Sequence, residues 1–343
     1  MPKVKVPVST NSAASIFKTR KAFALAPRRE CHVNRCPNSP IRSHSISKNH
    51  LSLIETDGHL FTLSERELFD GTFIEYSNAT VVKKVGIGDA TTFDGFCSNH
   101  DNDLYQSIDK IQFDLTPNNL LLYAHRNFAR QVSEHSSRVD QLKHFFSIHP
   151  PPPEPLRSAA LRPLKVMELN LDYIRRGFRE LSHTINTSKQ QRFTHLVLET
   201  NARIGFAIST ILFPTYSIFG DSYGRDVNGW PVSLTILPDA NRSLILLTSR
   251  NHNYLASVAF LNSIETAFKS AHKNITSSCI AVAAIEGCPV FSQKWWDCLT
   301  LDQQEFFFKC SQFSDHENTD PSVLSSAKHI ILDSTPIISC SRL

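Results

Sequence analysis

The 343-residue chain has no apolar run long enough to cross a bilayer or to form a secretory signal. The best candidate run, Ile204 to Phe213, is far shorter than the roughly 20 residues of a membrane helix. A phosphate loop, a dinucleotide fingerprint, a Ser/His/Asp triad signature and an internal repeat are also missing from the sequence. We therefore expect a soluble, cytoplasmic protein without these nucleotide-binding motifs and without a serine-hydrolase triad.

Acidic residues are absent from the first 29 positions, although the formal net charge of the whole chain is only +4. A segment of this composition can lie on nucleic-acid phosphates. A disordered tail and an organelle transit peptide fit the same composition. The candidate phosphate contacts in this basic arm, residues 1–30, are Lys18, Arg20, Lys21, Arg28 and Arg29.

A proline-rich stretch at 149–155 predicts a linker, because consecutive prolines favour an extended spacer. It separates a predicted N-terminal module with its long helix, residues 31–148, from a predicted C-terminal domain, residues 156–335. At 41% hydrophobic residues the chain can build two cores. The expected fold class is α+β, with a small N-terminal module followed by an α+β domain that contains a small antiparallel sheet.

Several elements are indicated by local signals. Thr116-Pro117 is a cap and first-turn pair that predicts a helix to about Phe146, and Thr300 to Gln303 is a capping box. The segments at 230–237 and 243–249 read as a hairpin, and 58–63 and 72–76 as strands. Apolar patterns predict helices over 166–185, 193–212 and 254–271, and a buried strand over 278–285.

The eight cysteines include two short pairs with metal-ligand spacing. Cys31 and Cys36 are separated by four residues, and Cys97 and His100 by two. Without a secretion signal a disulfide framework is not expected, whereas thiolate and imidazole ligands suit a four-coordinate zinc ion. One pair on a loop and one at a helix start is the arrangement of a treble clef. His32 is an alternative ligand. It is also possible to read these residues as three reduced cysteines beside a surface histidine that bind no metal.

Three segments around these pairs resemble a known family: Ser43-His44-Ser45-Ile46, Asp57-Gly58-His59, and Thr92 through Asp101. Over roughly residues 31–109 the chain resembles uncharacterised bacterial proteins that look like zinc-stabilised His-Asn-His (HNH, ββα-metal) endonucleases. The resemblance implies that His44 is the general base, that Asn49 or Asn99 orients it, and that Asp101 and Asp103 bind a catalytic Mg²⁺ or Mn²⁺. Many members have an acidic residue directly before the base histidine, where this chain has Ser43.

Simpler roles exist for the same residues. His44 also fits a buried histidine that holds its own hairpin, and His59 fits a surface position after a turn glycine. Asp101 and Asp103 fit a charged first helical turn. Trp295 and Trp296 fit core packing better than base stacking, and Arg126 and Arg130, one turn apart, fit a solvated face as well as a phosphate contact.

Two functions therefore remain open. The first is a metal-dependent nuclease of a prokaryotic defence or mobile-element system that cleaves DNA or RNA. The second is a non-catalytic, zinc-stabilised accessory subunit that binds nucleic acid or a protein partner. The defence context rests on the resemblance alone.

Overall fold

The structure is a computed structural model that describes residues 30–65, 80–147, 151, 154–187, 192–218, 221–223, 230–251, 255–270, 274–312 and 331–343. The basic arm and the expected strand at 72–76 lie outside these ranges. The described residues form a mixed α+β fold with two antiparallel sheets, which confirms the predicted fold class at this level.

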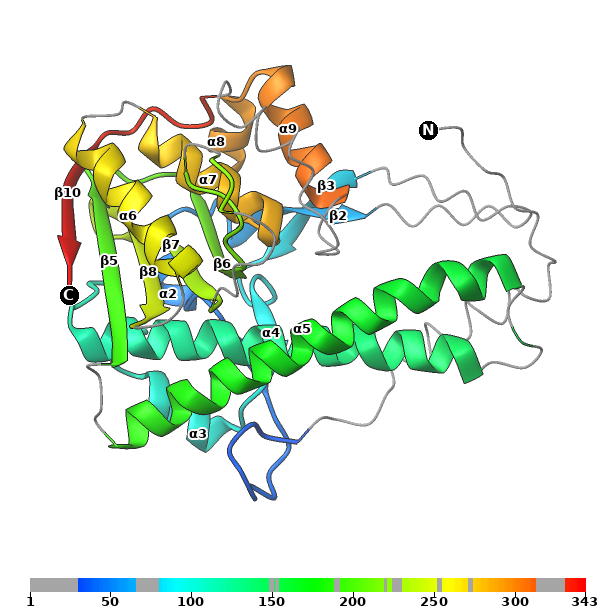
Figure 1. Cartoon of the computed structure of the whole chain (residues 1–343). Helices are drawn as coiled ribbons and strands as arrows, with labels where there is room; N and C mark the ends of the chain where they lie inside the picture. Colours follow the sequence, from blue (N-terminus) through cyan, green and yellow to red (C-terminus); the bar gives the residue numbers. More distant parts are fainter. Residues whose placement is uncertain are drawn as a thin grey trace.

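The larger sheet has eight strands in the order β10-β5-β8-β7-β6-β9-β2-β3, and every neighbouring pair is antiparallel. It spans the molecule from β10 at one edge to β2 and β3 at the other (Figure 1). It is much larger than the small sheet expected from the sequence. Its strands are β2 (His59–Glu65), β3 (Thr80–Gly86), β5 (Phe193–Thr200), β6 (Phe206–Leu212), β7 (Val232–Asp239), β8 (Arg242–Arg250), β9 (Val290–Phe291) and β10 (Ile337–Arg342).

Helices cover both faces of this sheet. All residues of β6 and β7 are buried, as expected for strands that have apolar layers on both sides. One face packs against α6 (Leu255–Lys269), α7 (Ile275–Glu286) and α9 (Leu301–Gln312), with the short α8 (Gln293–Asp297) beside them. The other face packs against α4 (Pro117–Ser147).

The helix α4 begins at Pro117, as the cap signal predicts, and the Thr116 hydroxyl accepts a hydrogen bond from the Asn119 N–H (3.2 Å). It pairs with α5 (Glu154–Thr187) to form a long antiparallel hairpin that extends past the sheet (Figure 1). The start of α5 lies twelve residues before the expected one. Glu154 and Pro155 occupy its first turn, where proline lacks only an N–H that has no helical partner.

Gly177 allows the two long helices to cross closely. A Cβ atom added there would lie 2.2 Å from Cε1 of Phe128 on α4. On helix propensity alone, Gly177→Ala would raise the free energy of unfolding by up to about 1 kcal/mol. We expect instead a loss of about 1–2 kcal/mol, since overpacking a core contact outweighs that gain.

Urea unfolding of the Gly177→Ala, Phe128→Leu and double variants measures this. We expect Gly177→Ala to lower the free energy of unfolding by less in the Phe128→Leu background, because the shorter side chain leaves room for the methyl group. A Gly177→Ala protein more stable than wild type would refute the close crossing.

A second, two-stranded sheet pairs β1 (Arg42–His44) with β4 (Thr92–Asp94). The helix α3 (Ser98–Tyr105) follows β4, and the short α2 (Lys48–Leu51) follows β1. In Figure 1 α3 lies below α4, on the side of α4 that faces away from the sheet. The two strands are 47 residues apart in sequence, and the chain between them supplies β2 and β3 to the large sheet.

The linker expected at 149–155 remains a prediction, since most of it lies outside the described residues. Strands from both sides of it nonetheless join in one sheet, because β2 pairs with β9.

Two expected elements are wrong. Residues 193–212 form the strands β5 and β6 rather than a helix, with the break at Asn201 to Gly205. Residues 278–285 belong to helix α7 rather than to a strand. Strand β6 is buried on both faces and most of α7 is buried, and burial on opposite sides weakens the periodicity that distinguishes helix from strand.

Candidate metal centre

The loop that contains Cys31 and Cys36 is held against the segment before α3 by backbone hydrogen bonds. The His32 N–H donates to the Gly95 carbonyl (2.7 Å), and the Ile41 N–H donates to the Phe96 carbonyl (2.7 Å). Within the loop the Cys36 N–H donates to the Val33 carbonyl (3.1 Å), which closes a tight turn. This turn brings both thiols to the same side, toward the start of α3.

Cys97 is the N-cap of α3 and His100 lies three residues later, so both side chains project from the first turn. The backbone N–H of His100, in the first turn of α3, is the main influence that lowers the pKa of Cys97 to about 7. By contrast, burial raises the pKa of Cys31. The helix start therefore favours the thiolate form that a metal requires.

The four ligand atoms lie within 4.8 Å of one another. The Sγ atoms of Cys36 and Cys97 are 3.8 Å apart, and Nδ1 of His100 lies 3.4 Å from Sγ of Cys31 and 3.3 Å from Sγ of Cys97. In a tetrahedron with Zn–S bonds of about 2.3 Å and a Zn–N bond of about 2.0 Å, these separations are about 3.8 Å and about 3.5 Å. The cluster could hold a metal ion, and its geometry is compatible with structural zinc. All three cysteines are free.

Aromatic side chains surround the cluster. Phe96, directly before Cys97, is fully buried and packs edge-on against Tyr105 and the His32 ring. His32 is not one of the clustered ligands, because its ring contacts Phe178 of α5 and its Nε2 lies 3.2 Å from the Ser133 hydroxyl of α4. The site is thus part of the core between α3, α4 and α5.

His44 lies at the end of β1 with its side chain partly buried. Its Nε2 is 3.1 Å from the Ile87 carbonyl. A carbonyl only accepts hydrogen bonds, so this contact assigns the proton to Nε2 and leaves Nδ1 with the lone pair. Burial lowers the pKa of His44, the Ile87 carbonyl and Asp101 act in the opposite direction, and the ring is neutral near pH 7.

Asp101 follows the ligand His100 and is close enough to His44 to influence its pKa. Its Oδ1 is buried and has no hydrogen-bond partner among the described residues. Asp103 is exposed and two residues further along α3, so it projects from a different side of the helix. The two carboxylates therefore do not face one common ion.

Asn49 does not contact His44. Its side-chain amide donates to the Asp109 carbonyl (2.6 Å), whereas the Ile87 carbonyl is the group that holds the His44 ring. No sequence pattern marks Ile87 as a partner of His44, because the contact uses its backbone. His59 bonds its own turn, with Nδ1 2.6 Å from the Asp57 carbonyl.

Arg126 and Arg130 lie on the buried side of α4, which rules out the solvated face and leaves neither free to contact phosphate. Arg126 makes a two-pronged ion pair with Asp109 (2.7 and 3.1 Å) and covers the Tyr105 ring at 4.2 Å. Arg130 pairs with Glu134 (2.7 Å). The Arg126–Asp109 pair, which sequence analysis did not find, ties α4 to the segment after α3.

The remaining candidates lie away from the cluster. Trp296 is buried and stacks on Phe291 (4.7 Å), so core packing explains it. The five basic residues of the N-terminal arm lie outside the described residues.

No family model, characterised protein or solved structure matches the chain. The structure itself thus provides the evidence for the site. No helix among the described residues has both the length and the apolar character needed to cross a membrane.

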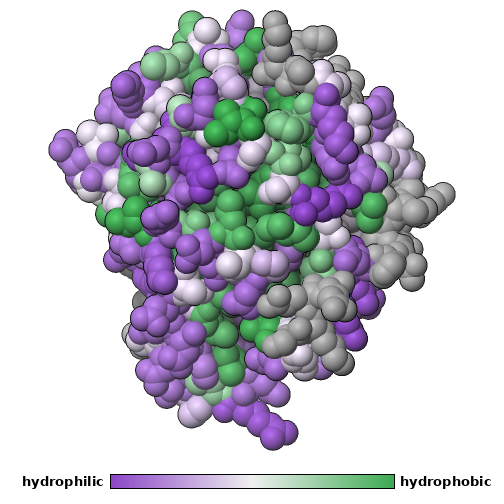
Figure 2. Space-filling model, turned by 90° about the vertical axis from the view of Figure 1, so that its left-hand side faces the viewer, coloured by the Kyte–Doolittle hydropathy of each residue, from purple (hydrophilic) through white to green (hydrophobic). Residues whose placement is uncertain are grey.

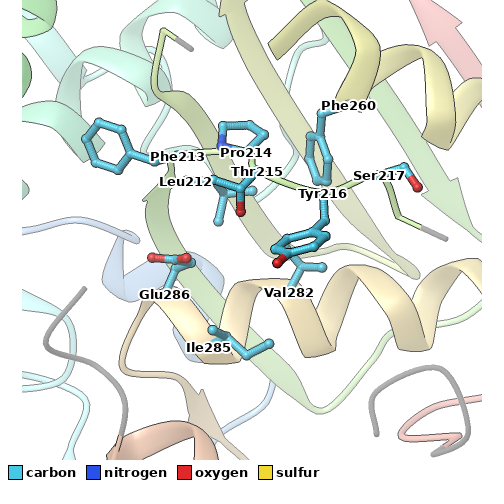
Figure 3. Close-up of a pocket in the computed structure, with 10 residues that line it drawn as sticks. All are labelled: Leu212, Phe213, Pro214, Thr215, Tyr216, Ser217, Phe260, Val282, Ile285 and Glu286. Atoms are coloured by element: carbon cyan, nitrogen blue, oxygen red, sulfur yellow. The ribbon is translucent and has the colours of Figure 1, made fainter. Parts of the chain in front are cut away.

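A pocket between the end of β6, α6 and α7 is unrelated to the cluster (Figure 3). It is lined by Leu212 to Ser217, Phe260, Val282, Ile285 and Glu286. Its volume of about 30 Å³ has room for one or two water molecules. It is too small for a substrate.

Proposed function

We propose that Cys31, Cys36, Cys97 and His100 bind one structural zinc ion and that the module is a treble clef. Three observations support this: a loop supplies two ligands, the first turn of α3 supplies two more, and the two strands of the β1–β4 sheet lie between them in sequence. A closed set of four thiolate and imidazole ligands is the arrangement of structural zinc sites.

We propose further that the module is an HNH-like nuclease centred on His44 and Asp101. One observation carries the proposal: Asp101, next to a metal ligand, has a buried carboxylate oxygen without a partner among the described residues and acts electrostatically on His44. An unpaired buried carboxylate oxygen is costly, and a divalent cation would satisfy it.

In the proposed reaction, Nδ1 of His44 accepts the proton of a water molecule while the water oxygen attacks the phosphorus atom of a phosphodiester. The ester oxygen then leaves and is protonated by solvent. The Ile87 carbonyl keeps His44 in the tautomer that this step requires. Asp101 would hold a Mg²⁺ or Mn²⁺ ion, which neutralises phosphate charge and stabilises the leaving oxygen when bound.

A second candidate, a zinc-stabilised module that binds nucleic acid without cleaving it, is favoured by one observation. Among the described residues, the zinc-type cluster is the single group of three or more metal-binding side chains. A catalytic ion at Asp101 would thus depend on water and substrate phosphates for most of its ligands, as Mg²⁺ often does.

Cleavage assays separate the two candidates. Purified protein is incubated with DNA or RNA in Mg²⁺, in Mn²⁺ or in chelator, and compared with His44→Ala and Asp101→Asn. Because a general base contributes about 10²–10⁴-fold, we expect each variant to lose at least about 100-fold in rate. Zinc content and melting temperature, measured in parallel, exclude misfolding.

The matched controls are His59→Ala and Asp103→Asn, which remove the same groups outside the proposed site and should retain activity. Full activity in His44→Ala would contradict the nuclease assignment. A zinc-loaded wild type that binds nucleic acid and cuts neither substrate would establish the second candidate.

A further inference from the structure

A hollow on the outer side of α5 is lined by three arginines, one histidine and one glutamate. It has a volume of about 380 Å³ and is open to solvent. Its lining residues are Arg176, Arg179, Glu180, His183 and Arg192. The first four come from α5, and Arg192 directly precedes β5.

The charge of this hollow is not balanced locally. Its one carboxylate, Glu180, is already paired with Arg250 (3.2 Å), and Arg250 lies over the Trp230 ring. Arg176, Arg179 and Arg192 are exposed and form no ion pair among the described residues. An exposed cluster of three unpaired guanidinium groups attracts an anionic ligand.

The arrangement fits an extended ligand better than a compact one. Arg176, Arg179 and His183 follow one another at intervals of three and four residues, so they lie on one face of α5. With a rise of about 1.5 Å per residue, the row is about 10 Å long. Phosphates of one nucleic-acid strand advance about 3.4 Å per nucleotide, so the row spans about three of them.

Helix α5 also packs against residues that lie near the candidate metal centre. Phe178 stacks on His125 (4.7 Å) and packs edge-on against His32 (5.5 Å). Arg179 is the next residue, on the solvent side. Hydrophilic residues are numerous on the lower part of the face shown in Figure 2.

We infer that this hollow binds the phosphate backbone of a nucleic acid, through Arg176, Arg179 and Arg192, with His183 beside them. The inference deepens the proposed function, since it rests on a nucleic acid being the ligand of this chain. One guanidinium group can donate two parallel hydrogen bonds to the oxygens of a phosphate. Such phosphate contacts do not depend on the base sequence.

The test is fluorescence anisotropy with labelled single-stranded and duplex oligonucleotides, without divalent cations, so that binding is measured apart from cleavage. Wild type is compared with Arg176→Gln/Arg179→Gln/Arg192→Gln. We expect at least a tenfold loss of affinity at low salt. The slope of log K against log salt for duplex should fall by about 2–3, because each lost phosphate contact contributes about 0.9.

The control, Lys110→Gln/Lys294→Gln/Lys309→Gln, removes the same charge from exposed positions elsewhere and should bind nearly as wild type does. Equal affinities of the two triple variants would overturn the inference, as would a wild type that binds no nucleic acid. Complete competition by millimolar inorganic phosphate would also overturn it, in favour of a small phosphate ligand.

This result is separable from the nuclease assignment. A loss of binding in the arginine variant together with no cleavage by wild type would keep the binding surface and reject the nuclease.

Discussion

Replacing Cys97 with serine is expected to release the metal and lower the melting temperature by about 5 °C or more. Cys97 supplies a ligand from the N-cap position of α3. Serine is a favoured N-cap residue, so the substitution keeps the helix start and removes only the thiolate ligand. An ion that binds only the folded state stabilises it by about 4 kcal/mol when its free concentration is 1,000 times its Kd. In a chain of 343 residues, each kcal/mol corresponds to about 1–2 °C.

Thermal unfolding followed by circular dichroism, with and without a strong chelator, measures this effect. Wild type in chelator should approach the melting temperature of Cys97→Ser, and added zinc should restore wild type alone. Cys298→Ser is the matched control, since Cys298 is exposed and outside the cluster. Chelator-insensitive unfolding of wild type would count against a structural metal.

Replacing Asp109 with alanine is expected to cost about 3–5 kcal/mol of unfolding free energy. The Arg126 side chain is 1% exposed and Asp109 is its ion-pair partner. Removal of the carboxylate leaves a buried guanidinium without a counter-charge, which costs far more than the pair contributes by itself. Urea unfolding monitored by tryptophan fluorescence provides the free energy.

Two comparisons sharpen this result. Asp89→Ala removes the partner of Arg42 in a surface pair whose side chains are each 60% exposed, and should cost less than about 1 kcal/mol. Arg126→Met in the Asp109→Ala background should recover part of the loss, because it also removes the unpaired charge. A cost for Asp109→Ala below that of Asp89→Ala would show that Arg126 is not held as described.

The candidate metal ligands could be read from the sequence because their signal is local. The spacing of the first pair fits a tight loop turn, and the spacing of the second pair fits one turn of a helix. Thiolate and imidazole are the side-chain groups that bind zinc in such sites. The start of α4 was predictable for the same reason, since Thr116 and Pro117 act on their own helix. The hairpin of β7 and β8 is likewise local and forms as expected.

Contacts between distant segments were not predictable from the pattern. The partner of His44 is the backbone of Ile87, and backbone atoms carry no sequence signature. In the sequence, Arg126 fits an exposed position of its helix. Only the fold brings it against Asp109, which lies 17 residues earlier in the chain. The large sheet was underestimated because β2 and β3 reach it from the other side of the proline-rich segment.

The central claim is that three sulfur atoms and one imidazole nitrogen bind a single zinc ion. X-ray absorption spectroscopy at the zinc edge, together with elemental analysis of purified protein, tests it directly. We predict one zinc per chain, with three sulfur neighbours at about 2.3 Å and one nitrogen neighbour at about 2.0 Å. A folded protein without zinc, or a zinc spectrum with only oxygen and nitrogen neighbours, would contradict it.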